Sequence, residues 1–176
     1  LKPRSISLLE KILTNSSSGI ATRQFTTADL GSVFGQSAED LNRSFDAHSP
    51  ALATEALTKA LAKADLHAEK IDALFVCTCT GYLCPGPSSH IAESLGLRPD
   101  AYLCDLVGLG CGAAIPTLRA AHGYLAANPS HAVAVVVSRP PTDEDAVARC
   151  LALSVDSHVQ GDGSAMAAFA PAVATT

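Results

Sequence analysis

The sequence predicts an α/β fold in which helices cover both faces of a mostly parallel, mixed sheet. Three short and mainly apolar runs, at residues 72–79, 101–107 and 131–138, have the length of buried strands. Segments with helical periodicity lie between these runs, and such an alternation builds parallel strands with helices packed on the sheet. We therefore expect a layered domain or part of a larger one, because 176 residues are enough to bury a substantial core.

Two helices are expected before the first of these strands. Residues 1–13 have apolar side chains near helical spacing, and the polar run that follows ends in Gly19. Residues 20–25 alternate weakly and are typical of a short strand or an extended arm. Ser49 followed by Pro50 predicts the start of the second helix, since serine caps free amides and proline is accepted in the first turn. An apolar stripe then continues to Ala64.

The remaining elements follow the strands in order. Residues 87–95 predict a helix that begins at Pro87 and ends before Gly96. The helix after Cys111 should bury one apolar face, and we expect His122 on that face to be a core residue. Four residues make up the face: Ile115, Leu118, His122 and Leu125. Residues 142–153 predict a helix capped by Thr142, and residues 164–170 predict a last strand.

The composition excludes several classes of function. Only 16% of the residues are charged, the net charge is −5, and lysine and arginine form no cluster, so nucleic acids and anionic membranes are poor partners. No apolar run reaches the roughly 18 residues that span a bilayer. Residues 1–13 also lack the apolar region of a signal peptide. Six cysteines without a secretory signal are interpreted as reduced thiols, and the expected location is cytoplasmic.

One thiol occupies a position suited to nucleophilic chemistry. A glycine-containing turn at 108–110 ends the second strand, and Cys111 and then a helix follow it. The free amides and the positive dipole end of a helix stabilise a thiolate and can also receive an oxyanion. Gly110 and Gly112 would let an acyl group approach the sulfur closely. The alternative is that Cys111 is a buried packing residue in a tight connection.

Several short motifs accompany this cysteine in a fixed order. They are Ile-Ala-Thr-Arg at 20–23, Cys-Thr-Cys-Thr-Gly at 77–81 with Pro-Gly at 85–86, Leu-Gly-Leu-Arg-Pro at 95–99, Gly-Cys at 110–111, and Gly-Asp-Gly-Ser-Ala at 161–165. In this order and spacing they resemble the N-terminal half of a chalcone/stilbene-synthase-type condensing enzyme, a type III polyketide synthase of the thiolase superfamily. The resemblance covers essentially the whole chain, and it implies one half of a thiolase-like layered fold with the nucleophile at a helix N-terminus.

The resemblance implies an acyltransferase that performs a decarboxylative Claisen condensation. Cys111 would take an acyl group from a thioester linked to coenzyme A or to a carrier protein, and a malonyl thioester would lose carbon dioxide to form the attacking enolate. The implied substrate-binding positions are Cys79, Thr80, Cys84 and Gln160. Cys84 would reach across a homodimer, and Gln160 stands where the family usually has a phenylalanine that gates decarboxylation. No cofactor or metal ion is implied beyond the thioester substrates.

The resemblance also implies that residues 1–176 are an incomplete N-terminal domain. Relatives have an additional first strand, and their C-terminal half carries a histidine and an asparagine that activate the thiol and hold the enolate oxygen. We therefore expect the 176-residue chain alone to be inactive. Glu10, Leu13 and Ser17 stand where plant relatives carry basic residues for the coenzyme A phosphates, and Arg139 replaces a common glutamate. The carrier of the acyl group thus stays open.

Two other functions remain open from the sequence. A ketoacyl-carrier-protein synthase III-like enzyme would share the fold and the cysteine but would catalyse a single condensation. A non-catalytic dimerisation or scaffold module would use Cys111 for packing only. A zinc site at Cys77, Cys79 and Cys84 is disfavoured, because this spacing lacks the paired two-residue knuckles of zinc modules and a fourth ligand nearby.

Overall fold

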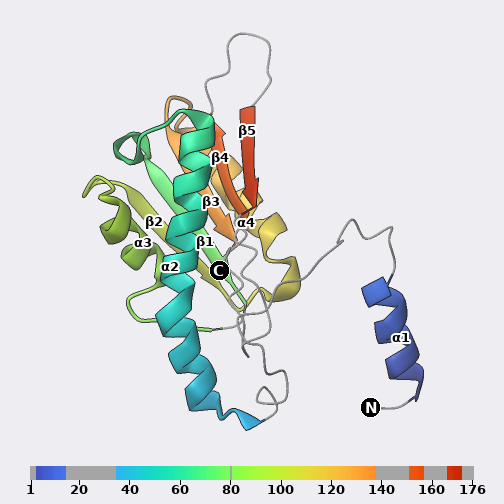
Figure 1. Cartoon of the computed structure of the whole chain (residues 1–176). Helices are drawn as coiled ribbons and strands as arrows, with labels where there is room; N and C mark the ends of the chain where they lie inside the picture. The colour runs from blue at the N-terminus through green and yellow to red at the C-terminus, as the bar shows by residue number, and fades with distance from the viewer. Residues whose placement is uncertain (1–2, 15–34, 80, 138–150, 157–165, 172–176) are drawn as a thin grey trace.

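A five-stranded sheet with helices on both faces forms the centre of the structure (Figure 1). The structure is a computed structural model that describes residues 3–14, 35–79, 81–137, 151–156 and 166–171. Its α-helices are α1 (Pro3–Thr14), α2 (Ala38–Ala64), α3 (Pro87–Leu95) and α4 (Ala114–Ala127). Its strands are β1 (Ala73–Thr78), β2 (Tyr102–Val107), β3 (Ala132–Val137), β4 (Leu151–Asp156) and β5 (Met166–Pro171). Two 3-10 helices, η3 (Ala68–Lys70) and η4 (Gly110–Gly112), precede β1 and α4.

The sheet is mixed, as the sequence predicted. Its strand order is β2-β1-β3-β4-β5; β1 pairs in parallel with β2 and β3, whereas β4 and β5 are added antiparallel. The register of β1 and β2 runs from Ala73 opposite Tyr102 to Thr78 opposite Val107. Because the two strands are parallel and in register, the loops that follow them leave the sheet at the same edge. We call this the carboxyl edge.

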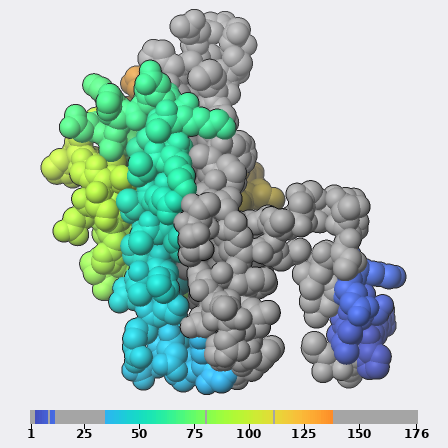
Figure 2. Space-filling model, in the orientation of Figure 1, coloured from blue at the N-terminus to red at the C-terminus, as the bar shows by residue number. Residues whose placement is uncertain are grey.

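Alternate residues of the central strands divide the core into two layers. Leu74 and Val76 of β1 belong to the cluster on the face covered by α2 and α3, whereas Phe75 packs with α4 on the other face. β3 alternates in the same way, which explains why both strands read as continuous apolar runs. Figure 1 shows α2 in front of the strands and α4 behind them, and Figure 2 shows α2 as a long column flanked by α3.

The second helix begins eleven residues earlier than Ser49, the predicted start, because a better cap lies upstream. The Ser37 hydroxyl accepts a hydrogen bond from the Asp40 amide at 3.2 Å, and the Asp40 carboxylate accepts one from the Ser37 amide at 3.0 Å. Ser49 is buried inside the helix, in the same turn as Pro50. Pro50 removes one helical donor, yet the buried face from Phe45 to Leu61 continues through it.

The predicted helix at 87–95 is confirmed, since α3 has these bounds and Gly96 ends it in the left-handed conformation with φ of 63°. The predicted apolar face of α4 is confirmed for Leu118 and Leu125, which pack on the sheet, and is wrong for the other two residues. Its buried residues are Thr117, Ala121 and Leu125, whereas Ile115 and His122 are exposed. Two of the buried residues, Thr117 and Ala121, are small, so the buried face of α4 is set by size as well as by hydrophobicity.

The predicted helix at 142–153 is wrong at its C-terminal end. Residues 151–153 begin β4, which pairs with β3 over its full length, from Leu151 opposite Val137 to Asp156 opposite Ala132. The apolar residues of this segment fit the strand period as well as the helical one. Pairing with β3 therefore made it a strand. The last strand is confirmed as β5. The expected strand or arm at 20–25 and residues 142–150 lie outside the described residues.

A carboxylate fixes the opposite edge of the sheet, where the parallel strands begin. Asp72 accepts hydrogen bonds from the amide of Ala132, at 2.8 Å, and from Nη2 of Arg98, at 2.9 Å. Arg98 belongs to the Leu-Gly-Leu-Arg-Pro motif and also bonds Asp100 through Nε at 2.9 Å. Burial raises the pKa of Asp72, but the amide and guanidinium bonds outweigh burial and hold the pKa below the ordinary value of an aspartate. The motif arginine therefore fastens the α3–β2 connection to β1.

Truncation of the β1 core should strongly destabilise the fold. Leu74 is completely buried between β1 and the α2–α3 layer, so Leu74→Ala removes apolar contacts and leaves a cavity. We expect the free energy of unfolding to fall by about 2–5 kcal/mol, measured by urea denaturation. Leu8→Ala is the matched control, because the Leu8 side chain is 58% exposed in α1 and its loss should cost less than about 0.5 kcal/mol. Equal losses would contradict the layered core.

Replacement of the Asp72 carboxylate should destabilise the protein in a pH-dependent way. A carboxyl group whose pKa is lowered by folding stabilises the native state only while it is ionised, so its contribution is lost as the pH falls below about 4. We expect Asp72→Asn to cost about 1–3 kcal/mol at neutral pH and progressively less at acid pH. Asp100→Asn is the control, since that carboxylate is 75% exposed and should matter little. A deficit independent of pH would contradict this role.

Candidate active site

The loops that leave β1 and β2 at the carboxyl edge bring several of the predicted site residues to one region. Cys79 follows the last residue of β1, and the turn to Cys111 follows the last residue of β2. Thr78 and Val107, where these loops begin, are opposite each other in the register. This is the edge at which parallel α/β sheets place ligands, because loops from adjacent strands diverge there.

The turn between β2 and α4 requires glycine at two positions. Gly108 has φ of 79° and Gly110 has φ of 69°, in the left-handed region that residues with a Cβ rarely adopt. A Cβ at Gly110 or Gly112 would meet no atom of the described residues within 4 Å. Conformation therefore explains Gly110, and the approach of an acyl group to this turn stays a prediction.

Cys111 is the central residue of η4, directly before α4. The Ala113 amide donates to the Gly110 carbonyl at 3.1 Å and closes this turn. α4 then starts at Ala114, and no side chain caps its N-terminus at Ala113. The backbone of Cys111 thus lies beside the positive end of a 14-residue helix, as the sequence predicted.

Two other thiols near this edge are held in the neutral form. Cys77 is fully buried, and burial raises the pKa of its thiol although a hydrogen bond with Thr117 lowers it in part. The Thr117 hydroxyl donates to the Ala113 carbonyl at 2.7 Å, so Thr117 joins β1 to the start of α4. Burial likewise raises the pKa of the Cys104 thiol. Burial therefore favours the neutral thiol at both positions, as expected for packing residues.

The loop at 81–86 is held at both ends by close contacts that only glycine permits. A Cβ on Gly81 would overlap the ring of Phe45, and a Cβ on Gly86 would overlap the carboxylate of Asp105. Phe45 is buried in α2, and Asp105 lies on β2. Between the two ends, Cys84 is exposed at the carboxyl edge.

A carboxylate from β2 caps the helix that follows this loop. Gly86 stands at the N-cap of α3 and has no side chain to cap it. Asp105 instead accepts hydrogen bonds from the Ser88 amide at 3.0 Å and from the Ser88 hydroxyl at 2.5 Å. Asp105 is therefore an N-cap supplied by a neighbouring strand.

The structure places the predicted substrate-binding residues only in part. Cys79 is half-buried at the end of β1 and Cys84 is exposed in the following loop. Both are free thiols, as are Cys77 and Cys104. Thr80 and Gln160 lie outside the described residues, as do Ser17 and Arg139.

Two residues that shape this edge, Asp105 and Thr117, were not predicted from the sequence. The one available signal was Asp105, a charged residue in the middle of a strand, because a carboxylate in such a position needs hydrogen-bond donors. Nothing in the sequence paired it with Ser88, which is 17 positions away. Thr117 gives no such signal.

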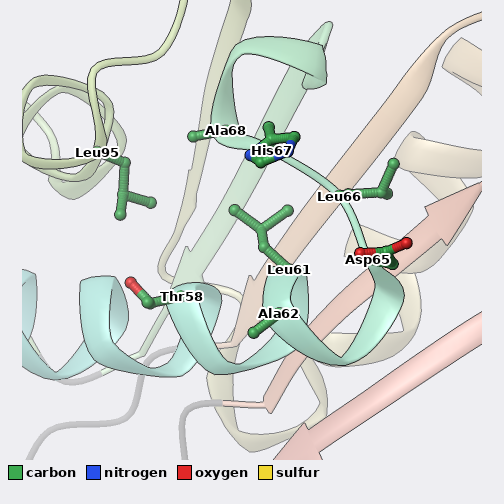
Figure 3. Close-up of a pocket in the computed structure, with 8 residues that line it drawn as sticks. All are labelled: Thr58, Leu61, Ala62, Asp65, Leu66, His67, Ala68 and Leu95. Carbon is green, nitrogen blue, oxygen red and sulfur yellow. The ribbon is translucent and has the colours of Figure 1, made fainter.

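A separate hollow of about 360 Å³ lies away from the carboxyl edge (Figure 3). It is lined by the C-terminal end of α2 with Asp65, by the segment from Leu66 to Ala68, and by Leu95 of α3. Its floor is mainly aliphatic, with Leu61 at the centre of the view. The segment at 66–68 leads into η3 and the start of β1, so the hollow is at the edge of the sheet opposite Cys111.

The described part of the chain contains neither a membrane-spanning helix nor a metal-binding group. None of the helices at 3–14, 38–64, 87–95 and 114–127 is long and apolar enough to cross a membrane. No three histidine, cysteine, aspartate or glutamate side chains converge within the same described ranges.

Comparison with known proteins identifies the family. The model of the family described as FAE1/Type III polyketide synthase-like protein matches residues 1–146. The chain is 27% identical over 118 residues to 1,3,6,8-tetrahydroxynaphthalene synthase of Streptomyces griseus, covering 67% of this chain and 32% of that protein. It is 35% identical over 88 residues to 3,5-dihydroxyphenylacetyl-CoA synthase of Amycolatopsis balhimycina, covering 50% of this chain and 24% of that protein. The chain thus spans about a quarter to a third of the length of these relatives.

A solved structure shows the same fold. The 1,3,6,8-tetrahydroxynaphthalene synthase of Streptomyces coelicolor A3(2), a bacterial type III polyketide synthase, superposes with a TM-score of 0.68 at 21% identity, covering 80% of this chain and 39% of that one. This likeness confirms the expected thiolase-like α/β fold. Since the family model spans most of the chain, this protein belongs to the FAE1/type III polyketide synthase-like family.

Proposed function

We propose that this chain forms part of a type III polyketide synthase in which Cys111 carries the growing acyl group. The family match over residues 1–146 is the observation on which this function rests, because it includes Cys111 and the motifs around it. The position of Cys111 between the glycine turn and α4 adds a physical reason, since a helix N-terminus stabilises a thiolate. The relatives span more sequence than this chain, so the complete activity is part of the proposal.

In the proposed reaction, the Cys111 thiolate attacks the carbonyl carbon of an acyl thioester and expels the carrier thiolate. A malonyl thioester then loses carbon dioxide, and the electron pair of the broken bond forms an enolate. The enolate carbon attacks the acyl carbonyl, a carbon–carbon bond forms, and the Cys111 thiolate leaves. Amides around Gly110 and Gly112 would stabilise the oxyanion of each tetrahedral intermediate.

We propose coenzyme A as the carrier of the acyl group. One relative is named 3,5-dihydroxyphenylacetyl-CoA synthase, that is, after a CoA thioester, which favours a CoA thioester over a carrier-protein thioester. Cys79, Thr80, Cys84 and Gln160 remain the proposed residues of the acyl pocket. A separate cofactor is not required, because the thioester substrates supply both the activated carbonyl and the latent carbanion.

The proposal predicts that Cys111 is the most reactive thiol of the chain. Iodoacetamide alkylation, followed by peptide mass spectrometry across a pH series, should show Cys111 reacting about tenfold faster than the exposed Cys84. Its rate should rise with pH around a midpoint below about 8.5, the value of an ordinary thiol. Cys77 and Cys104 should react slowly, because burial raises the pKa of both thiols.

Acyl transfer supplies the matched test. Acetyl-CoA should add an acetyl group to the complete synthase, and Cys111→Ser should abolish this mass increase whereas Cys104→Ser, at a thiol that packs against the core, should preserve it. If Cys111 reacts no faster than Cys84 and accepts no acyl group, the catalytic function is wrong and a scaffold role is favoured.

We also propose that the protein is a homodimer joined through β2. Among the described residues β2 pairs only with β1, so one edge of this strand is open, and Tyr102 and Val107 on it are 49% and 39% exposed. Open strand edges pair readily with another chain. Cys84, in the loop anchored to β2, would then lie near the partner.

The dimer has its own test. Val107→Lys places a charge on this edge without entering the core, and light scattering after size exclusion should show a shift from dimer to monomer. Leu8→Lys, at an exposed position of α1, should leave the oligomeric state unchanged. An unchanged mass for Val107→Lys would place the interface elsewhere.

A further inference from the structure

The strand that leads to Cys111 also holds the loop that contains Cys84. Asp105 lies two residues before the end of β2, and the glycine turn to Cys111 begins directly after that end. The Asp105 side chain lies on the α2–α3 face of the sheet, since its neighbour Leu103 two positions before packs there. From this face its carboxylate accepts two hydrogen bonds from Ser88.

The Asp105 carboxylate fixes the C-terminal end of the loop at 81–86 through two hydrogen bonds. Both oxygens are used, one by the Ser88 amide and the other by the Ser88 hydroxyl, so the group is fixed in distance and in rotation. Gly86 lies directly against it, and a Cβ at this position would overlap Oδ2. The negative charge at the N-terminus of α3 is also favoured by the helix dipole.

The other end of the loop is fixed independently by packing. The backbone of Gly81 lies on the ring of Phe45, which is 1% exposed. The loop at 81–86 is therefore clamped between an aromatic contact on α2 and a carboxylate on β2. The exposed side chains of Tyr82 and Cys84 lie between these clamps.

We propose that Asp105 is a positioning residue that sets the space beside Cys111 for the acyl chain, by holding the loop at 81–86, which follows β1 at the carboxyl edge, at a fixed place relative to the nucleophile turn. This inference rests on the proposed function of Cys111. Asp105 touches no reacting atom in this role, and its effect reaches the site through Ser88 and Gly86. Displacement of a positioning group by about 1 Å can change a rate by up to a hundredfold, so loss of such a clamp should be measurable.

The test compares two alkylating reagents of the same chemistry and different length. Iodoacetamide and N-octyl iodoacetamide are reacted with the purified chain, and the rate at Cys111 is measured for each by peptide mass spectrometry. The ratio of the two rates cancels the thiolate fraction, so it reports the space beside the sulfur. We expect the ratio to change more than about threefold in Asp105→Asn and in Gly86→Ala, whose new Cβ displaces the carboxylate without removing it.

Ser88→Ala provides a milder variant in case the first two do not fold. It removes the hydroxyl bond and keeps the amide bond, so its ratio should change in the same direction and by less. Amide hydrogen exchange at residues 81–89 should become faster in the same variants, which reports the release of the loop directly.

Asp72→Asn is the matched control for a general loss of stability. Asp72 also ties a loop to a strand through two hydrogen bonds, but at the opposite edge of the sheet. In Asp72→Asn, the ratio of the two alkylation rates at Cys111 should equal that of the unmodified chain. The inference is overturned if Asp105→Asn changes the ratio by less than about threefold, or if Asp72→Asn changes it equally.

The outcomes separate this inference from the proposed function. A fast Cys111 with an unchanged ratio in the Asp105 and Gly86 variants retains the function and rejects the positioning role. A Cys111 no faster than Cys84, with a ratio that changes only in those variants, rejects the function and retains the clamp. A Cys111 that reacts with neither reagent overturns both.

Discussion

The in-register parallel pairing of β1 with β2 is the constraint on which the candidate site depends. It places the ends of the two strands, Thr78 and Val107, side by side, so that the loop with Cys79 and the turn with Cys111 begin at one edge. A slip of one residue would move every side chain of the strand to the opposite face, and the two apolar clusters on opposite faces oppose such a slip. The burial that stabilises the sheet therefore also sets the geometry of the site.

Two carboxylates connect this sheet to the chain around it, one at each edge. Asp72 joins the start of β1 to β3 and, through Arg98, to the α3–β2 connection. Asp105 joins β2 to the start of α3. Each carboxylate is half-buried and receives two hydrogen bonds, which offsets the cost of removing a charge from water. Such anchors fix loops in place where packing alone would leave them several arrangements.

The cysteines divide into groups according to their surroundings. Cys77 and Cys104 are neutral packing residues whose pKa values are raised by burial, and Cys84 is exposed on a clamped loop. Cys111 differs from them in its backbone position, between two glycines and directly before a helix. Membership of the type III polyketide synthase-like family agrees with this division, because the proposed chemistry needs one ionised thiol among inert ones.

The sequence by itself determined the α/β class, the three central strands, α3 with its glycine stop, and the turn that presents Cys111. These depend on local composition, on the spacing of apolar residues and on glycine conformation, all of which are written in neighbouring residues. Tertiary structure decided three features against a local pattern. A competing cap set the start of α2, small buried residues set part of the buried face of α4, and pairing with β3 made residues 151–153 a strand. Tertiary structure also decided the contacts of Asp105 with Ser88 and of Phe45 with Gly81, since these join residues that only the folded chain brings together.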